Sequence, residues 1–247
     1  NDNIMYSTYV NGQLYRSMDR WNLDVYHDIT PLDGSGNPLQ GEWETPYLLN
    51  PLNSSTVIAG YNDVYMSPDR GDTWSRMSTN LASGDNIQEL AVAPSDSMVI
   101  YASRGNVLYH TLDYGSNWTS ASLPGSERIS AILVDPVDPS TIWVARSGYG
   151  NKVYLSNNYG DSYTDISGSL PNVPANCLYY EPGSLNGIFV GTDLGVFYIN
   201  DTLSDWVSFN DGLPAVPVMD FAYCPATHKL RIATWGRGIW ESDPYAV

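Results

Sequence analysis

Apolar residues occur along the chain in short stretches of four to seven residues that are bounded by polar and turn-forming residues. The stretches 99–102 and 107–111 show the pattern, since the four residues between them include Gly105. Stretches of this length predict β-strands and are too short for helices. The pattern therefore predicts an all-β protein made of many short strands.

A proline follows an apolar stretch at a nearly constant interval. The intervals between successive prolines are 43, 42, 46 and 43 residues, and the prolines are Pro51, Pro94, Pro136, Pro182 and Pro225. Repeats with periods of about 20 to 50 residues are typical of solenoids and propellers. We therefore expect one turn of the same kind in each repeat.

A second motif keeps the same period. The segment 67–74 (SPDRGDTW) recurs at 111–118 (TLDYGSNW), more loosely at 156–163, and weakly at 17–19 and 201–206. We expect a hairpin turn in which Ser, Thr and Asp side chains bond to the turn backbone, Gly adopts a positive φ, and Trp packs on the neighbouring sheet. The predicted structural residues are Ser67, Asp69, Gly71, Trp74, Thr111, Asp113, Gly115, Trp118, Ser156, Asn158 and Gly160.

One repeat contains four predicted strands, at 87–92, at 98–102, at 107–111 and from about residue 118. Four antiparallel strands in about 40 to 50 residues predict a β-propeller blade. The chain is then a single propeller region, 1–247, with partial blades at 1–30 and 218–243 and complete blades at 45–86, 87–128, 129–174 and 175–217.

The two partial blades duplicate their second and third strands and so do not complete each other. We therefore expect the C-terminal portion of a propeller of seven or eight blades. The expected partners are the remaining blades, on the same precursor or on a companion chain.

Composition removes several classes of partner. The 247 residues include 27 acidic and 11 basic side chains, so the net charge is −16. This charge repels nucleic acid and anionic lipid, and no apolar run approaches the roughly 20 residues of a membrane helix. We expect neither a nucleic-acid partner nor membrane insertion. Cys177 and Cys224 form one disulfide or are separate small apolar residues, and the sequence leaves both alternatives open.

The segments 67–74 and 111–118 match Ser/Thr-x-Asp-x-Gly-x-x-Trp and resemble the Asp-box, also called the bacterial neuraminidase repeat. Asp-box propellers include sialidases, glycoside hydrolase family 74 xyloglucanases, sortilin-type receptors and photosystem assembly factors. The last third, with 190–197 (VGTDLGVF) and 233–241 (ATWGRGIWE), is similar to large secreted Asp-box proteins of Bacteroidetes that use type IX secretion. The resemblance implies an extracellular or cell-surface location, and it identifies a fold and not an activity.

The copies of the motif depart from the pattern at several positions. Trp21 stands where Gly is expected, and Asp24 stands where Trp is expected. The third copy has Asn158 and Tyr163 in place of Asp and Trp. Such changes indicate a role in packing.

Ligands are expected at the end of the blades opposite the prolines and the motif turns. The loops there join the second strand to the third and the fourth strand to the next blade. The candidate binding residues are Asp63, Arg104, Arg146, Tyr149, Asp193, Trp235 and Arg237, together with loop 31–46, which carries Asp33, Glu42, Trp43 and Glu44. Charged residues at a blade tip are alternatively solvated or paired with the next blade. Trp235 and Arg237 suit a sugar or a carboxylate.

No motif assigns a catalytic residue, a metal ligand or a cofactor. A sialidase mechanism needs clustered arginines, a Tyr nucleophile and an Asp acid, and a family 74 mechanism needs two Asp residues across a cleft between two propellers. The histidines His27, His110 and His228 lack metal-binding spacing. The preferred interpretation is an extracellular non-catalytic propeller that binds a polysaccharide or a surface protein or serves as a structural module. The alternative is part of a sialidase-like or xyloglucanase-like glycoside hydrolase.

Overall fold

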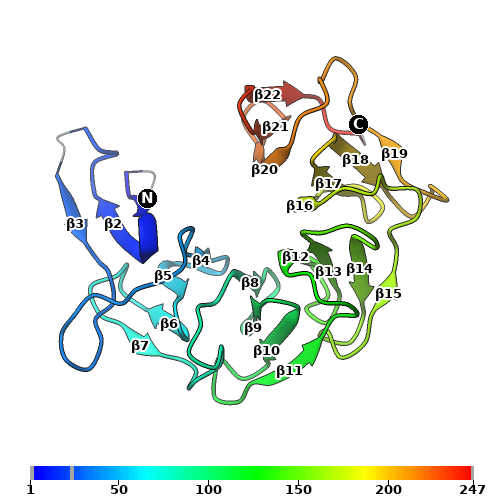
Figure 1. Ribbon diagram of the computed structural model, residues 1–247. Coiled ribbons are helices and arrows are strands. Elements are labelled where there is room, and N and C mark those ends of the chain that lie inside the picture. Colours follow the sequence, from blue (N-terminus) through cyan, green and yellow to red (C-terminus); the bar gives the residue numbers. More distant parts are fainter. Residues whose placement is uncertain (1–2, 23–24, 246–247) are drawn as a thin grey trace. The chain divides into compact units, whose positions relative to one another are not determined.

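The computed structural model describes residues 3–22 and 25–245 (Figure 1). These residues form 22 strands and one short 3₁₀-helix, η1 (Val10–Gly12). The strands make six antiparallel sheets, of which four have four strands and two have three. The prediction of an all-β propeller built from four-stranded blades is confirmed. Asp24 lies outside the described residues.

The chain divides into two compact units, residues 1–122 and 123–247. Within every sheet the hydrogen-bonded neighbours are consecutive along the chain, so each sheet is a simple meander. No helix in the described part of the chain has the length and apolar character needed to cross a membrane.

The first unit contains three sheets (Figure 1). The first sheet has β1 (Met5–Tyr9), β2 (Gln13–Ser17) and β3 (Tyr26–Asp28). The second has β4 (Tyr47–Asn50), β5 (Asn53–Gly60), β6 (Val64–Ser67) and β7 (Ser75–Arg76). The third has β8 (Glu89–Ala93), β9 (Asp96–Arg104), β10 (Val107–Thr111) and β11 (Thr119–Ser122).

The second unit repeats this arrangement. Its sheets are β12 (Ile129–Val134), β13 (Ile142–Arg146), β14 (Val153–Ser156) and β15 (Thr164–Asp165), followed by β16 (Ala175–Tyr180), β17 (Ile188–Thr192), β18 (Gly195–Ile199) and β19 (Val207–Ser208). The last sheet has β20 (Val218–Cys224), β21 (Lys229–Thr234) and β22 (Gly238–Ser242).

The core of each unit lies between successive sheets. In the first unit Ile58, Val64, Ile87 and Ile100 form one buried cluster, to which the second and third sheets both contribute. In the second unit Phe189, Val218 and Phe221 form an equivalent cluster. The central strands are buried on both faces, which explains why β5, β9 and β13 contain continuous apolar runs and do not alternate.

The motif turns join the third strand of a sheet to the fourth. Ser67 Oγ accepts from the Gly71 amide at 2.6 Å and donates to Asp69 Oδ1 at 2.8 Å. The Trp74 indole Nε1 donates to the Ile29 carbonyl of the preceding sheet at 2.8 Å. Trp118 and Trp206 make the same kind of bond to Met77 and Ile166, at 3.0 and 2.7 Å. Each of these turns therefore ties one sheet to the sheet before it.

The substituted motifs keep the same backbone. Asn158 accepts from the Ser162 amide at 3.0 Å, as Asp69 does from that of Thr73 at 2.8 Å. Trp21 adopts a φ of 62° in the place of the motif glycine, and its amide donates to Ser17 Oγ at 2.8 Å.

The two cysteines are not bridged to each other. Cys177 is buried in the core beside β20, and burial raises the pKa of its thiol. Cys224 is partly exposed, and hydrogen bonds from Thr227 lower the pKa of its thiol.

Candidate functional site

A shallow groove with a volume of about 500 Å³ crosses three sheets of the first unit. We call it the aromatic groove. Its walls come from the end of β1 and η1, from the loop between β3 and β4, and from the first residues of β4 and β8. The residues that line it are Thr8, Tyr9, Val10, Trp43, Glu44, Thr45, Pro46, Tyr47, Gln88 and Glu89.

Two aromatic side chains of the groove are exposed to solvent. Trp43 is 69% exposed and Tyr9 is 64% exposed, whereas Tyr47 is half-buried. Large apolar rings are usually buried, so several that gather at one open groove indicate a binding surface. Aromatic rings offer a flat apolar face together with a polar edge, and the apolar C–H face of a sugar ring stacks on such a surface.

The loop that carries Trp43 is held against the 3₁₀-helix. The Gly41 amide donates to the Asn11 carbonyl at 2.9 Å, and Thr45 Oγ1 donates to the Glu42 carbonyl at 2.8 Å. The hydroxyl of the buried Tyr61 donates to the Gly12 carbonyl at 2.5 Å and so supports η1 from the core. These bonds hold in place the backbone around Trp43 and Tyr9.

Gly12 is required at its position for two reasons. Its φ is +87°, and a Cβ there would lie 2.6 Å from the ring of Tyr61. A larger residue would therefore displace either η1 or the tyrosine that supports it.

The wall of the groove formed by Gln88 and Glu89 is held in place by hydrogen bonds to β9 and to the residue that follows it. The Gln88 amide donates to the Ser103 carbonyl at 2.8 Å, and Gln88 Oε1 accepts from the Gly105 amide at 2.9 Å. Glu89 begins β8 directly beside it and is half-buried. Glu44, on the opposite wall, is exposed. The groove therefore combines aromatic faces with carboxylate oxygens, each of which can accept more than one hydroxyl proton.

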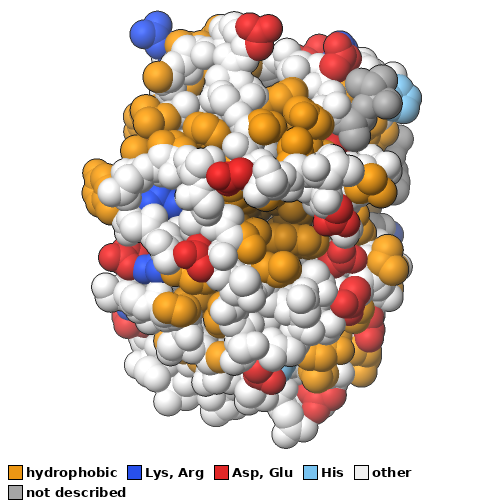
Figure 2. Space-filling model, turned by 90° about the vertical axis from the view of Figure 1, so that its right-hand side faces the viewer, with side chains coloured by type: hydrophobic (Ala, Val, Ile, Leu, Met, Phe, Trp, Pro, Cys, Tyr) orange, Lys and Arg blue, Asp and Glu red, His pale blue; other side chains and the backbone are white. Residues whose placement is uncertain are grey.

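The electrostatics of the groove disfavour anions. The residues that line it include two carboxylates and no Lys or Arg. The whole chain carries a net charge of −16, and Figure 2 shows acidic side chains spread over one face of the molecule. A neutral ligand meets no repulsion here, whereas a phosphate, sulfate or uronate would.

The predicted loop residues in the first unit make internal contacts. Asp63 is fully buried and accepts from Ser78 Oγ at 2.6 Å, the Leu81 amide at 2.9 Å and Arg76 Nε at 2.9 Å. Burial alone would raise the pKa of this carboxyl, but the hydrogen bonds outweigh it and lower the pKa. Arg104 is paired with Asp85. These contacts hold the loops together, and ligand binding by Asp63 and Arg104 stays a prediction.

In the second unit the predicted residues divide into buried and exposed ones. Arg146 is 5% exposed, is paired with Glu127, and donates to the Tyr154 hydroxyl at 3.0 Å. Asp193 accepts from Asn176 at 3.0 Å. Tyr149 and Trp235 are 71% and 72% exposed.

Arg237 lies beside Trp235 in the loop between β21 and β22, and its carbonyl accepts from the Trp240 indole. None of the seven predicted residues lines the aromatic groove.

Sequence reasoning identified one part of the groove and missed the rest. Trp43 and Glu44 belong to the loop that was expected to bind ligands, whereas Glu42 does not line the groove. Tyr9, Tyr47 and Glu89 carry no local motif, because only the packing of successive sheets brings them together. In the described residues no group of three or more His, Cys, Asp or Glu side chains is placed to hold a metal ion.

Comparisons with known proteins agree with this fold. A family model described as Sortilin-Vps10 (sortilin, neurotensin receptor 3) matches residues 62–174. A xyloglucanase from a Paenibacillus species is 26% identical over an alignment of 185 residues, and the match covers 60% of this chain and 18% of that protein. The chain therefore spans about a fifth of the length of the curated relative that it matches.

Solved structures show the same architecture. An ancestral GH74 enzyme superposes with a TM-score of 0.74 at 13% identity, over 97% of this chain and 34% of that one. YCF48 bound to a D1 peptide has a TM-score of 0.69 at 12% identity, over 100% of this chain and 76% of that one. The extracellular domain of BT4673 from B. thetaiotaomicron gives 0.69 at 12% identity, over 100% and 32%. The molecule is a β-propeller of the sortilin and GH74 type.

Proposed function

We propose that this chain is a non-catalytic, carbohydrate-binding propeller that holds a neutral polysaccharide along the aromatic groove. The observation that carries the proposal is the pair of exposed rings, Tyr9 and Trp43, set in one groove with Glu44 and Glu89. The rings supply stacking surfaces for sugar faces, and the carboxylates accept from sugar hydroxyls.

The ligand class follows from charge and from the relatives. The acidic groove disfavours anionic glycans, and similarity to a xyloglucanase suggests a neutral plant β-glucan as the first ligand to test.

The location proposed is outside the cell or at its surface. One structural neighbour is an extracellular domain from B. thetaiotaomicron, which agrees with secretion by a Bacteroidetes-type system. The hydrogen-bonded motif turns support assignment of the repeats to the Asp-box class.

Further blades are the proposed protein partner, on the same precursor or on a companion chain. Met5 is 45% exposed on β1, whereas the second strands of the four-stranded sheets are largely buried. A further blade packed against the first sheet would cover this side chain. A surface protein is the other proposed ligand class.

A second candidate function is part of a glycoside hydrolase of the xyloglucanase kind. The xyloglucanase relative and the GH74 neighbour favour it. Glu44 and Glu89 are the two carboxylates that line the groove, and they would have to act as acid and base in place of the two Asp residues of a family 74 mechanism.

Calorimetric titration with xyloglucan oligosaccharides tests the proposal, together with an assay for new reducing ends. We expect the wild type to bind without turnover, and Trp43→Ala to weaken binding about fivefold to tenfold, because a stacked aromatic ring contributes about 1 to 1.4 kcal/mol. Trp235→Ala removes an equally exposed tryptophan outside the groove and should leave the affinity unchanged.

Turnover that disappears in Glu44→Gln or Glu89→Gln would support the hydrolase and contradict the binding role. Equal affinities for the wild type and Trp43→Ala would show that the groove is not the site.

A further inference from the structure

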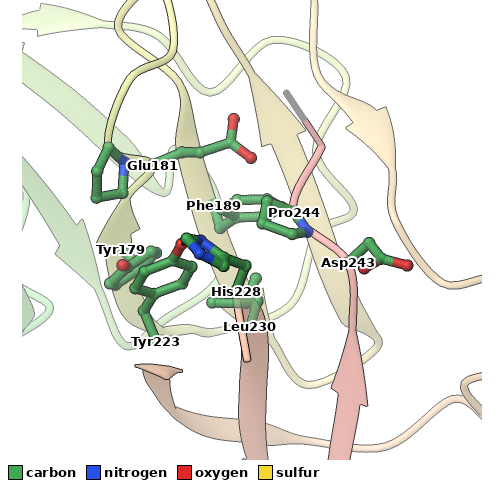
Figure 3. A pocket seen from close by; sticks show the side chains of 9 residues that line it. Tyr179, Glu181, Phe189, Tyr223, His228, Leu230, Asp243 and Pro244 are labelled. Carbon is green, nitrogen blue, oxygen red and sulfur yellow. The ribbon is translucent and has the colours of Figure 1, made fainter. Parts of the chain in front are cut away.

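A second cavity lies in the second unit, at the end of the sheets where first and second strands are joined (Figure 3). It has a volume of about 470 Å³, and we call it the tyrosine pocket. Residues at the adjoining ends of β16, β17, β20 and β21 form it, together with the segment after β22. The residues that line it are Tyr179, Glu181, Pro182, Phe189, Tyr223, His228, Leu230, Asp243 and Pro244.

The base of the tyrosine pocket is apolar and rigid. Phe189 and Leu230 are 0% and 3% exposed and belong to the core of the unit. Tyr179 is held by ring contacts with Phe189 and Phe221, at centroid distances of 6.5 and 6.1 Å. A ligand therefore meets Tyr179, a half-buried ring that the core behind it holds in place.

Polar groups surround this apolar base. The Tyr223 hydroxyl lies 3.0 Å from His228 Nδ1, and Figure 3 shows the two side chains next to each other. Glu181 Oε2 accepts from the Tyr198 hydroxyl at 2.6 Å. Asp243 Oδ1 accepts from Lys229 Nζ at 2.5 Å.

These bonds fix the positions of the side chains. Asp243 and His228 are exposed and can bond further, because a carboxylate has about four acceptor sites and an imidazole has a second ring nitrogen. Oriented acceptors and donors therefore surround the cavity while their positions are held by neighbours. This arrangement suits a ligand with several hydroxyl groups.

The charges of the pocket favour a neutral ligand. Glu181 and Asp243 repel anions, and Lys229 offsets the charge of Asp243, so attraction for cations is reduced. A hexose combines an apolar C–H face with hydroxyls at its edge, which matches the aromatic base and polar rim. The cavity is of the size that holds a small ligand, since ligand pockets are about 300 to 1,000 Å³.

We propose that the tyrosine pocket binds a single hexose residue of a neutral glycan, as a site separate from the aromatic groove. Tyr179 stacks on the sugar ring, and Tyr223, His228 and Asp243 bond to its hydroxyls. This site does not depend on the function proposed for the groove, because it belongs to other sheets and other residues.

Saturation-transfer NMR on the full chain, with methyl β-glucoside, methyl β-galactoside and methyl β-xyloside as probes, tests the proposal, and every pocket variant also carries Trp43→Ala so that the aromatic groove does not contribute. We expect transfer to at least one glycoside in the wild type and in Trp43→Ala, and a loss of at least fivefold when Tyr223→Ala is added. Unfolding curves check that the variant is folded. If Tyr223→Ala does not fold, His228→Ala replaces it, since His228 is exposed and its loss leaves the core intact.

No transfer to any of the three glycosides in the wild type would overturn the proposal. Transfer that persists in folded Tyr223→Ala and in His228→Ala would overturn it as well. Loss of transfer in Trp43→Ala alone would place the sugar in the groove and contradict a second site.

Discussion

At the scale of single residues, two aspartates carry different structural tasks. Asp63 is buried and satisfies donors from four other residues, so it closes the loop that leads from one sheet to the next. Asp69 lies near the surface and fixes a motif turn through the amide and hydroxyl of Thr73, at 2.8 and 2.6 Å. The same side-chain type therefore makes different contributions to stability at the two positions.

Replacement of Asp63 by Ala should lower the free energy of unfolding by about 3 kcal/mol, because the buried Ser78 hydroxyl and two backbone amides lose their acceptor and Arg76 loses its ion-pair partner. Asp193→Ala is the matched control, since Asp193 is partly exposed and accepts a hydrogen bond from Asn176, and its loss should cost about 1 kcal/mol or less. Urea denaturation measures both. Equal losses in the two variants would contradict the assigned role of Asp63.

Asp69 makes the stability of the protein depend on pH in the acidic range. Hydrogen bonds from Thr73 lower the pKa of its carboxyl to about 2 from the usual 3.8. Because the folded-state pKa is lower, this contribution is complete above the unfolded pKa and is lost as pH falls from about 4 towards 2.

Asp69→Asn should keep the turn, since Asn158 makes the equivalent bond in another copy of the motif. The variant should show a smaller decrease in the urea midpoint than the wild type between pH 4 and pH 2.5. An unchanged pH dependence would exclude Asp69 as a source of acid lability.

At the scale of elements, the tryptophan of each motif turn connects neighbouring sheets. Trp74→Phe keeps the ring contacts but removes the 2.8 Å bond from Nε1 to the Ile29 carbonyl. We expect a loss of about 1 kcal/mol in unfolding free energy. Trp43→Phe, on a ring that is 69% exposed, should change it by less than about 0.5 kcal/mol. Equal values by chemical denaturation would refute the connecting role.

The sequence predicts the elements better than the site because strand and turn signals are local. The third strand of one repeat was expected at 107–111, and β10 is Val107–Thr111. The second was expected at 98–102, whereas β9 extends over Asp96–Arg104, because its pairing with β8 and β10 continues into polar ends. The sequence indicates Trp43 as a candidate because it is an aromatic residue in a loop at the end of a blade. Tyr9 and Glu89 could not be predicted from the sequence, because only the packing of sheets from distant parts of the chain brings them into one groove.

At the scale of the whole molecule, the repeated sheets and the acidic net charge both bear on which ligands we expect. The repeats give each unit a rigid framework with loops at both ends of the sheets, and the net charge of −16 restricts ligands to neutral or cationic ones. We therefore propose a neutral polysaccharide as the ligand of the exposed rings in the aromatic groove.

A crystal structure of the chain with a xyloglucan oligosaccharide tests this account most directly. The account predicts an intact oligosaccharide in the aromatic groove, with a sugar ring stacked on Trp43 and hydroxyls bonded to Glu44 or Glu89. A sugar chain that is cleaved, or that binds while leaving Trp43 and Tyr9 uncovered, would contradict it.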